Sequence, residues 1–174
     1  MYNILYIFIE GDDDERFFQR ILIPHLRKSY DYIKLVPYAN DPDLKVNQYI
    51  ESINSMDFAS LIFTSDYDQA PCYSYQKNKK TEAYKDLHLD NVFIVREEIE
   101  SWYAAGISEA LVQNYKLQPH TTTDQMKKEE FLTLVPPRIG RLQFILQILG
   151  DYDLGLACKK NSSLNYFIEK YCVY

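Results

Sequence analysis

Glu10, Asp66 and Asp68 are the side chains of this chain whose positions best suit metal chemistry. Each follows an apolar, strand-like run, at residues 4–9 for Glu10 and at residues 60–64 for the two aspartates. Ligands of an open parallel sheet bind outside the carboxyl ends of the strands, so we expect the three carboxylates to meet in one crevice. Clustered carboxylates repel one another unless a proton or a hard cation neutralises them. Mg²⁺ is usually held by one or two carboxylates plus substrate phosphates.

The elements that place these carboxylates follow from the apolar pattern up to Val95. Short apolar runs predict strands at residues 4–9, 33–38, 61–64 and 91–95. Helices are expected from the acidic stretch at residues 12–15 to Pro24 and at residues 44–53, and a polar loop at 67–80 before a short helix at 81–87. This alternation predicts an α/β fold with a parallel four-stranded sheet flanked by helices.

After Val95 the pattern becomes helical. Helices are expected at residues 97–105, 108–115, 127–134, 140–149 and 164–171. No internal repeat or low-complexity linker marks a separate domain. We therefore expect an α/β core over residues 1–115 and a helical extension over residues 116–174, packed on the same domain.

Composition narrows the class of protein. The 174 residues fit one domain, and the net charge of −6 argues against a sequence-independent nucleic-acid coat protein. The three cysteines have no CxxC spacing, which favours neither a disulfide framework nor a zinc site and fits a reducing cytosol. The apolar run near the N-terminus is too short and too soon followed by acids for a signal peptide or a membrane span. We expect a cytoplasmic protein without membrane association.

Four consecutive acids follow Gly11, directly after the first predicted strand. A glycine at this point permits a tight turn and close approach of a ligand to the backbone, and the helix N-terminus that follows favours an anion. Asp14 lies about one turn into the helix and is expected to face the crevice as a catalytic candidate, whereas Asp12 and Asp13 face solvent. An acidic, well-capped helix start without a ligand explains the same residues.

Two further segments contribute candidates. Glu98 or Glu100, after the fourth predicted strand, is expected to complete the site as a supporting catalytic or metal ligand, although a helix N-terminus beside a buried tryptophan fits the same spacing. The Asp66–Asp68 pair likewise fits an aspartate-rich turn. The lysines that follow this pair are candidate nucleic-acid contacts through phosphate: Lys77, Lys79 and Lys80.

Taken together, these motifs resemble the Toprim domain of topoisomerases, primases and the overcoming-lysogenization-defect nucleases. The resemblance rests on Glu10-Gly11 after the first strand and on Asp66-Tyr67-Asp68 after a later one. Small Toprim-like bacterial families of uncharacterised proteins show a similar start, here residues 9–18, a similar tryptophan helix, here residues 98–102, and a similar closing segment, here residues 157–167. Those families often place an aspartate after the tryptophan helix, where this chain has Ala105-Gly106.

The resemblance implies divalent-metal-dependent hydrolysis of phosphodiesters in nucleic acid, with Mg²⁺ or Mn²⁺ as cofactor. Glu10 would be a metal ligand or general acid/base, and Asp66 and Asp68 would be metal ligands. Two cations can activate water and stabilise the leaving oxygen of an in-line displacement. A short Toprim-like protein also implies a partner, such as an ATPase, that supplies targeting.

Two other interpretations stay open at this point. A receiver-like phosphoacceptor domain also carries acids after its first strand and an aspartate after its third; Asp12 or Asp13 would then bind Mg²⁺ and Asp66 would be phosphorylated. Against it, the fourth predicted strand ends in Val95-Arg96-Glu97 rather than in a hydroxyl residue. The third interpretation is a catalytically silent interaction subunit of a defence or toxin–antitoxin assembly.

Overall fold

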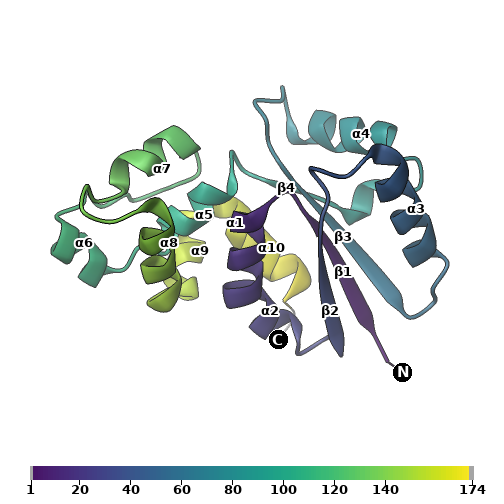
Figure 1. Ribbon diagram of the computed structural model, residues 1–174, viewed down its shortest axis with the longest axis horizontal. Helices are drawn as coiled ribbons and strands as arrows, with labels where there is room; N and C mark the ends of the chain where they lie inside the picture. Colours follow the sequence, from purple (N-terminus) through teal and green to yellow (C-terminus); the bar gives the residue numbers. More distant parts are fainter. Residues whose placement is uncertain (1, 173–174) are drawn as a thin grey trace. The chain divides into compact units, whose positions relative to one another are not determined.

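The computed structural model describes residues 2–172 (Figure 1). These residues form two compact units, one made of residues 2–95 with 171–172 and the other of Arg96–Lys170. A compact unit is defined by the contacts of the folded chain, whereas a domain must also be able to fold alone. The domain boundary near residue 115 therefore stays a prediction.

The first unit is built on the parallel sheet that the strand pattern predicts. Its strands are β1 (Ile4–Ile9), β2 (Tyr32–Pro37), β3 (Ala59–Asp66) and β4 (Val92–Val95), in the order β2-β1-β3-β4. Every pair is parallel. The α/β fold class is therefore confirmed. Because the chain leaves β1 for β2 on one side and returns to β3 on the other, the switch point of this sheet lies between the carboxyl ends of β1 and β3.

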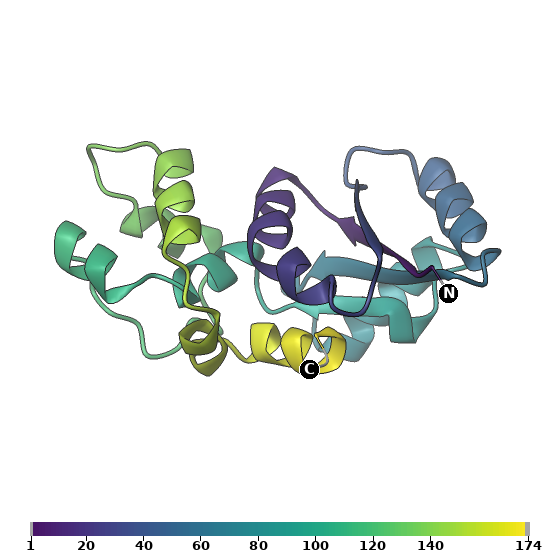
Figure 2. The same ribbon diagram turned by 90° about the horizontal axis from the view of Figure 1, so that it is seen from below.

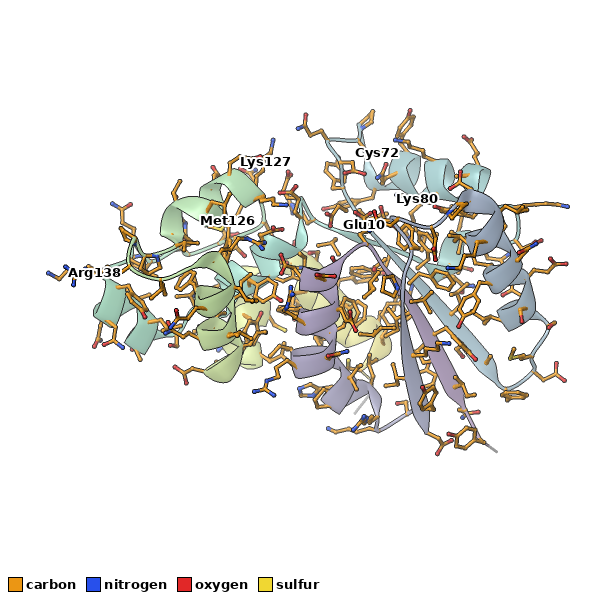
Figure 3. The ribbon with its side chains drawn as sticks, in the orientation of Figure 1. Glu10, Cys72, Lys80, Met126, Lys127 and Arg138 are labelled. Carbon is orange, nitrogen blue, oxygen red and sulfur yellow. The ribbon has the colours of Figure 1, made fainter. Side chains whose placement is uncertain are left out.

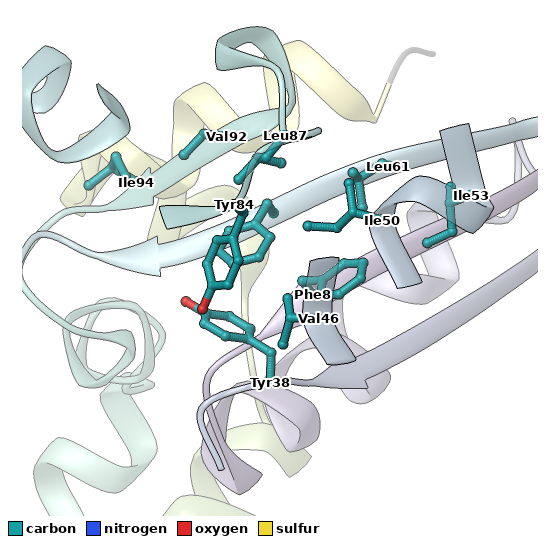
Figure 4. Close-up of a cluster of buried hydrophobic side chains, with 11 residues drawn as sticks. Phe8, Tyr38, Val46, Ile50, Ile53, Leu61, Tyr84, Leu87, Val92 and Ile94 are labelled. Atoms are coloured by element: carbon teal, nitrogen blue, oxygen red, sulfur yellow. The ribbon is translucent and has the colours of Figure 1, made fainter. Parts of the chain in front are cut away.

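One face of the sheet carries an aromatic core. Phe8 of β1 stacks on Phe63 of β3 with ring centroids 5.4 Å apart, and the ring of Tyr38 lies 4.4 Å from that of Phe63. Helix α3 (Asp43–Asn54) adds three apolar side chains from one of its faces. Figure 4 shows this cluster, which comprises Phe8, Tyr38, Val46, Ile50, Ile53, Leu61, Phe63, Tyr84, Leu87, Val92 and Ile94. The cluster packs across β1 and β3 near their carboxyl ends.

A helical segment that starts directly after β1 lies on the other side of the sheet from α3 (Figure 1). It consists of α1 (Asp12–Phe17), a π-helical turn η1 (Phe18–Leu22) and α2 (Ile23–Leu26). The expected end at Pro24 is wrong, because Pro24 lies in the first turn of α2, where its missing N–H costs little. The wide turn before it is closed by the Ile23 N–H, which bonds to the Phe18 carbonyl.

The loop expected at residues 67–80 and the helix expected at 81–87 are both wrong, because a single helix, α4 (Tyr73–Ala83), covers most of this segment. The segment is polar and has no apolar stripe, so helical periodicity could not reveal it. Its N-cap is Cys72, whose Sγ accepts a hydrogen bond from the Tyr75 N–H at 3.4 Å. A short 3-10 turn, η2 (Leu89–Asn91), precedes β4.

The second unit is helical, as expected after Val95. Its helices are α5 (Ile99–Ala105), α6 (Glu109–Tyr115), α7 (Lys128–Leu134), α8 (Arg141–Gly150), α9 (Leu154–Lys160) and α10 (Ser162–Tyr171). Figure 2 shows them joined by irregular loops. Helix α9 was not predicted, although its cap Asp153 accepts a hydrogen bond from the Leu156 N–H at 2.8 Å. Within residues 2–172 no helix combines the length and the apolar content needed to cross a membrane.

Buried polar groups organise the second unit around α5. Asn161 is fully buried and donates to the hydroxyls of Ser101 and Thr123 at 3.2 and 3.1 Å. Its carbonyl accepts from the Ser163 hydroxyl at 2.9 Å and from the Leu164 N–H at 3.0 Å. Both N–H groups and both lone pairs of this amide are thus used, which is the condition for burying it at low cost.

Gly106, at the end of α5, provides a test of close packing in the second unit. A Cβ at this position would overlap the ring of Tyr152, whose hydroxyl donates to the Trp102 carbonyl at 2.7 Å. We expect Gly106→Ala to lower the free energy of unfolding by about 1–3 kcal/mol. Gly150→Ala is the matched control, because a Cβ there meets no atom within 4 Å. In a urea titration it should leave stability unchanged or raise it by up to about 1 kcal/mol, and equal stabilities would contradict the packing at Gly106.

Candidate active site

The carboxylate of Glu10 joins the ends of β1 and β3. Glu10 follows Ile9, the last residue of β1, and its Oε1 accepts a hydrogen bond from the backbone N–H of Asp66, the last residue of β3, at 3.3 Å. The neighbouring Ser65 hydroxyl donates to the same oxygen at 3.1 Å. Two segments more than fifty positions apart are therefore in direct contact at the switch point of the sheet.

Two further side chains contact the same oxygen of Glu10. The Tyr38 hydroxyl donates to Oε1 at 3.0 Å, and the Lys80 ammonium lies 3.7 Å from it. Figure 3 shows Glu10 and Lys80 close together at this end of the sheet. The side chain of Glu10 remains 27 % exposed. Because all these contacts use Oε1, the carboxylate is held in one orientation while Oε2 is left to an incoming group.

Tyr38 acts as a neutral donor in this arrangement. Burial, together with the adjacent Glu10 carboxylate, raises the pKa of its phenol far above the ordinary value. A tyrosinate beside Glu10 would place two negative charges in contact in a desolvated site. Tyr38 therefore stays protonated and orients Glu10 rather than serving as a nucleophile.

The turn that carries Asp68 has an unusual backbone. Asp68 and Gln69 both adopt left-handed conformations, with φ of 51° and 55°. Asp68 is exposed, and its Oδ2 accepts a hydrogen bond from the Gln76 amide at 3.1 Å. The same amide donates to the Asp66 carbonyl at 2.9 Å. Helix α4 thus fixes the position of the second aspartate through one side chain.

We call the carboxyl ends of β1 and β3, with Glu10, Asp66 and Asp68, the rim. Its oxygen donors suit a hard cation, although they do not surround one completely. Among residues 2–172 no group of three or more histidine, cysteine, aspartate or glutamate side chains is arranged to hold a metal ion. Glu10, Asp66 and Asp68 are hard oxygen donors, and Mg²⁺ commonly takes only one or two protein carboxylates with the remaining ligands from water and phosphate. The assignment of these three residues as metal ligands stays a prediction.

Asp14 is engaged at the start of α1. Its Oδ2 accepts a hydrogen bond from the Gly11 N–H at 3.2 Å, and the residue is 7 % exposed. This bond satisfies one of the donors left free at a helix N-terminus. Arg16 lies 2.7 Å from Asp13 and 3.6 Å from Asp12. The catalytic role expected for Asp14 stays a prediction. Its hydrogen bond to the Gly11 N–H is enough to explain an aspartate at this position.

Glu98 and Glu100 have partners within the second unit. Glu98 Oε2 accepts a hydrogen bond from the Lys128 N–H at 2.6 Å, and Glu100 Oε1 lies 2.8 Å from the Arg141 guanidinium. Lys128 is a further cation, 4.0 Å from Glu100. These contacts tie α5 to α7 and α8. The supporting role of the two glutamates in a metal site stays a prediction.

The three lysines of α4 differ in surroundings. Lys80 faces Glu10 and lies 5.7 Å from the centre of the Tyr38 ring, whereas Lys79 is exposed and Lys77 is half-buried. Sequence reasoning included these lysines but missed Tyr38, Ser65 and Gln76. Gln76 and Lys80 are four residues apart and share a face of a helix, a signal that was lost because the segment was expected to be a loop.

Glu100 provides a prediction on pH. Burial raises the pKa of its carboxyl, against the opposing effects of a backbone hydrogen bond, Lys128 and Arg141. A raised folded-state pKa contributes stability that is present below the unfolded pKa of about 4.3 and is lost as the pH rises through the folded pKa. We therefore expect the wild-type unfolding free energy to fall relative to that of Glu100→Gln as the pH rises above about 4.3. Urea titrations at several pH values measure this difference.

The control for this measurement is Glu129→Gln, which neutralises an exposed glutamate in the first turn of α7. Its stability relative to wild type should show no comparable pH trend. A trend of the same size in both variants would mean that the effect is one of net charge rather than of the buried carboxyl.

Comparison with known proteins leaves this site to be interpreted from its own geometry. No family model matches the chain, and no curated protein or solved structure shows significant similarity to it. The resemblance to Toprim domains therefore rests on the motifs Glu10-Gly11 and Asp66-Tyr67-Asp68, and the activity that it implies is a proposal.

Proposed function

We propose that this protein hydrolyses phosphodiester bonds of nucleic acid with Mg²⁺ or Mn²⁺ held by Glu10, Asp66 and Asp68. The main support is the hydrogen bond from the Asp66 N–H to Glu10 Oε1, because it puts two of the three carboxylate residues side by side at the switch point. The order of the two motifs along the chain, which resembles that of Toprim domains, also supports the proposal.

In this proposal the residues of the rim have separate tasks. Glu10, whose Oε1 is anchored by Tyr38 and Ser65, presents Oε2 as a metal ligand or as the base that accepts a proton from water. Bound Mg²⁺ or Mn²⁺ would lower the pKa of a coordinated water and offset the charge that develops on the phosphate. Lys80 sits beside Glu10, where its ammonium can bind a phosphate oxygen.

The remaining lysines of α4, Lys77 and Lys79, would follow the nucleic-acid backbone away from the cleaved bond. Their contribution is electrostatic and independent of sequence, so it should weaken as salt is raised. The resemblance also leads us to propose a partner protein, such as an ATPase, that directs the nuclease to its substrate.

A nuclease assay tests the proposal directly. Wild type, Glu10→Gln and Asp68→Asn are incubated with single- and double-stranded DNA and RNA in Mg²⁺ or Mn²⁺, and cleavage is followed on gels. We expect cleavage by wild type that chelation abolishes, and a loss of at least about 100-fold in each variant, the usual contribution of a catalytic acid or base. Full activity in both variants would end the proposal.

Two exposed acids serve as matched controls. Asp57→Asn makes the same change as Asp68→Asn, but just before β3 and so at the opposite end of that strand. Glu51→Gln, on α3, makes the same change as Glu10→Gln. Both should cleave as wild type. Absence of cleavage and of Mg²⁺ or Mn²⁺ binding in calorimetry, with Asp66→Ala unchanged from wild type, would contradict the proposal and support an interaction subunit.

A phosphoacceptor function is the second candidate, favoured by the strand order β2-β1-β3-β4, which doubly wound phosphoacceptor proteins share. Asp66 would accept the phosphoryl group. Against it, Arg16 already occupies Asp13, one of the acids that would bind Mg²⁺. We expect incubation with a small acyl phosphate and Mg²⁺ to give no stable adduct by intact mass. An adduct that disappears in Asp66→Asn would favour signalling over hydrolysis.

A further inference from the structure

Gln76 is a fully buried amide placed against the Asp66–Asp68 turn. Its Nε2 donates to the Asp66 carbonyl at 2.9 Å and to Asp68 Oδ2 at 3.1 Å. Both partners are acceptors, so the NH₂ group must face the turn and the orientation of the amide is determined. The carbonyl Oε1 consequently points away from both, and within residues 2–172 this buried atom has no hydrogen-bond partner.

An amide at this position is not explained by packing. A hydrocarbon side chain of the same length would fill the space without burying an unpaired carbonyl, which carries a desolvation cost. The compensating feature is the pair of hydrogen bonds to the turn. The two hydrogen bonds from its NH₂ group, to the Asp66 carbonyl and to Asp68 Oδ2, therefore explain why a glutamine is found here.

The turn needs such support because of its backbone. Two consecutive residues other than glycine, Asp68 and Gln69, have positive φ, a conformation that persists only when the surroundings impose it. Gln76 bonds to the residue at the end of β3 and to the carboxylate two residues later, and so spans the turn. Its own position follows from the start of α4, where the Gln76 N–H bonds to the carbonyl of the cap residue Cys72 at 3.2 Å.

We propose that Gln76 is a positioning residue that holds the Asp68 carboxylate in place for a divalent cation. The inference rests on the proposed metal-dependent function and adds a residue to it. A neutral donor suits this task, because it occupies one lone pair of Oδ2 without cancelling the negative charge that attracts the cation. Lys80, one helical turn further along α4, faces Glu10 rather than Asp68.

The test compares Mg²⁺ binding by calorimetry and the Mg²⁺ dependence of cleavage in wild type and Gln76→Met. Methionine has a similar length but no N–H donor. We expect a loss of about 10- to 100-fold in Mg²⁺ affinity, the usual effect of removing a group that orients a metal ligand. Cleavage should recover at high Mg²⁺, and stability in urea should not fall in parallel, since a purely structural role would lower stability and leave the metal affinity unchanged.

Gln76→Asn gives a second, independent readout. The shorter side chain keeps an amide but draws its NH₂ group away from Asp68 Oδ2, so Mg²⁺ affinity should fall as it does in Gln76→Met. This variant also carries the test if Gln76→Met does not fold. Gln48→Met, an exposed glutamine on α3, is the matched control and should bind Mg²⁺ as wild type does.

The outcomes separate this inference from the proposed function. Wild-type Mg²⁺ affinity in both Gln76 variants, with binding lost in Asp68→Asn, would overturn the role of Gln76 and leave the function standing. Absence of Mg²⁺ and Mn²⁺ binding in wild type would overturn the function and this inference with it. Weakened Mg²⁺ binding in both Gln76 variants, without a parallel loss of stability in urea, supports the proposal.

Discussion

The rim of this sheet depends on one hydrogen bond, from the Asp66 N–H to Glu10 Oε1, which links the ends of two adjacent parallel strands. The bond can form because Phe8 and Phe63, two residues before Glu10 and three before Asp66, stack and hold β1 and β3 in register. Once Oε1 is fixed there, the Tyr38 hydroxyl and the Lys80 ammonium converge on the same atom. Donors from the ends of β2 and β3 and from α4 thus share one acceptor at the end of β1. The aromatic core beneath them sets the geometry of this charged layer.

The sequence predicted the parts of the fold that depend on apolar pattern. All four strands follow from short apolar runs, and the meeting of Glu10 with the end of β3 follows from its place directly after β1. Helix α4 was missed because its residues are polar and its cap is Cys72, an atypical N-cap. Gln76 was missed with it, since its role depends on facing the turn from a helix. Tyr38 carries no signal of its own, because an aromatic residue at a strand end is ordinary.

In the second unit, local contacts account for polar residues that were singled out as catalytic candidates. Glu98 receives the Lys128 N–H, and Glu100 receives Arg141. Asn161, with all its hydrogen-bonding capacity used, ties α5 to the loop at Thr123 and to the start of α10. A buried network of this kind specifies one arrangement, because any displacement leaves an amide or a hydroxyl without a partner. Motif spacing alone cannot distinguish such a network from an active site.

The ion pair between Lys80 and Glu10 offsets one negative charge of the rim before any ligand arrives. Under the proposed function, a cation on Glu10 would weaken the hold of that carboxylate on Lys80, and an anion on Lys80 would leave Glu10 more negative. Each ligand would then favour the other, and the two binding equilibria would be coupled by the same factor in both directions. With the proposed ligands, this sheet edge would favour a cation and an anion bound together over either one alone.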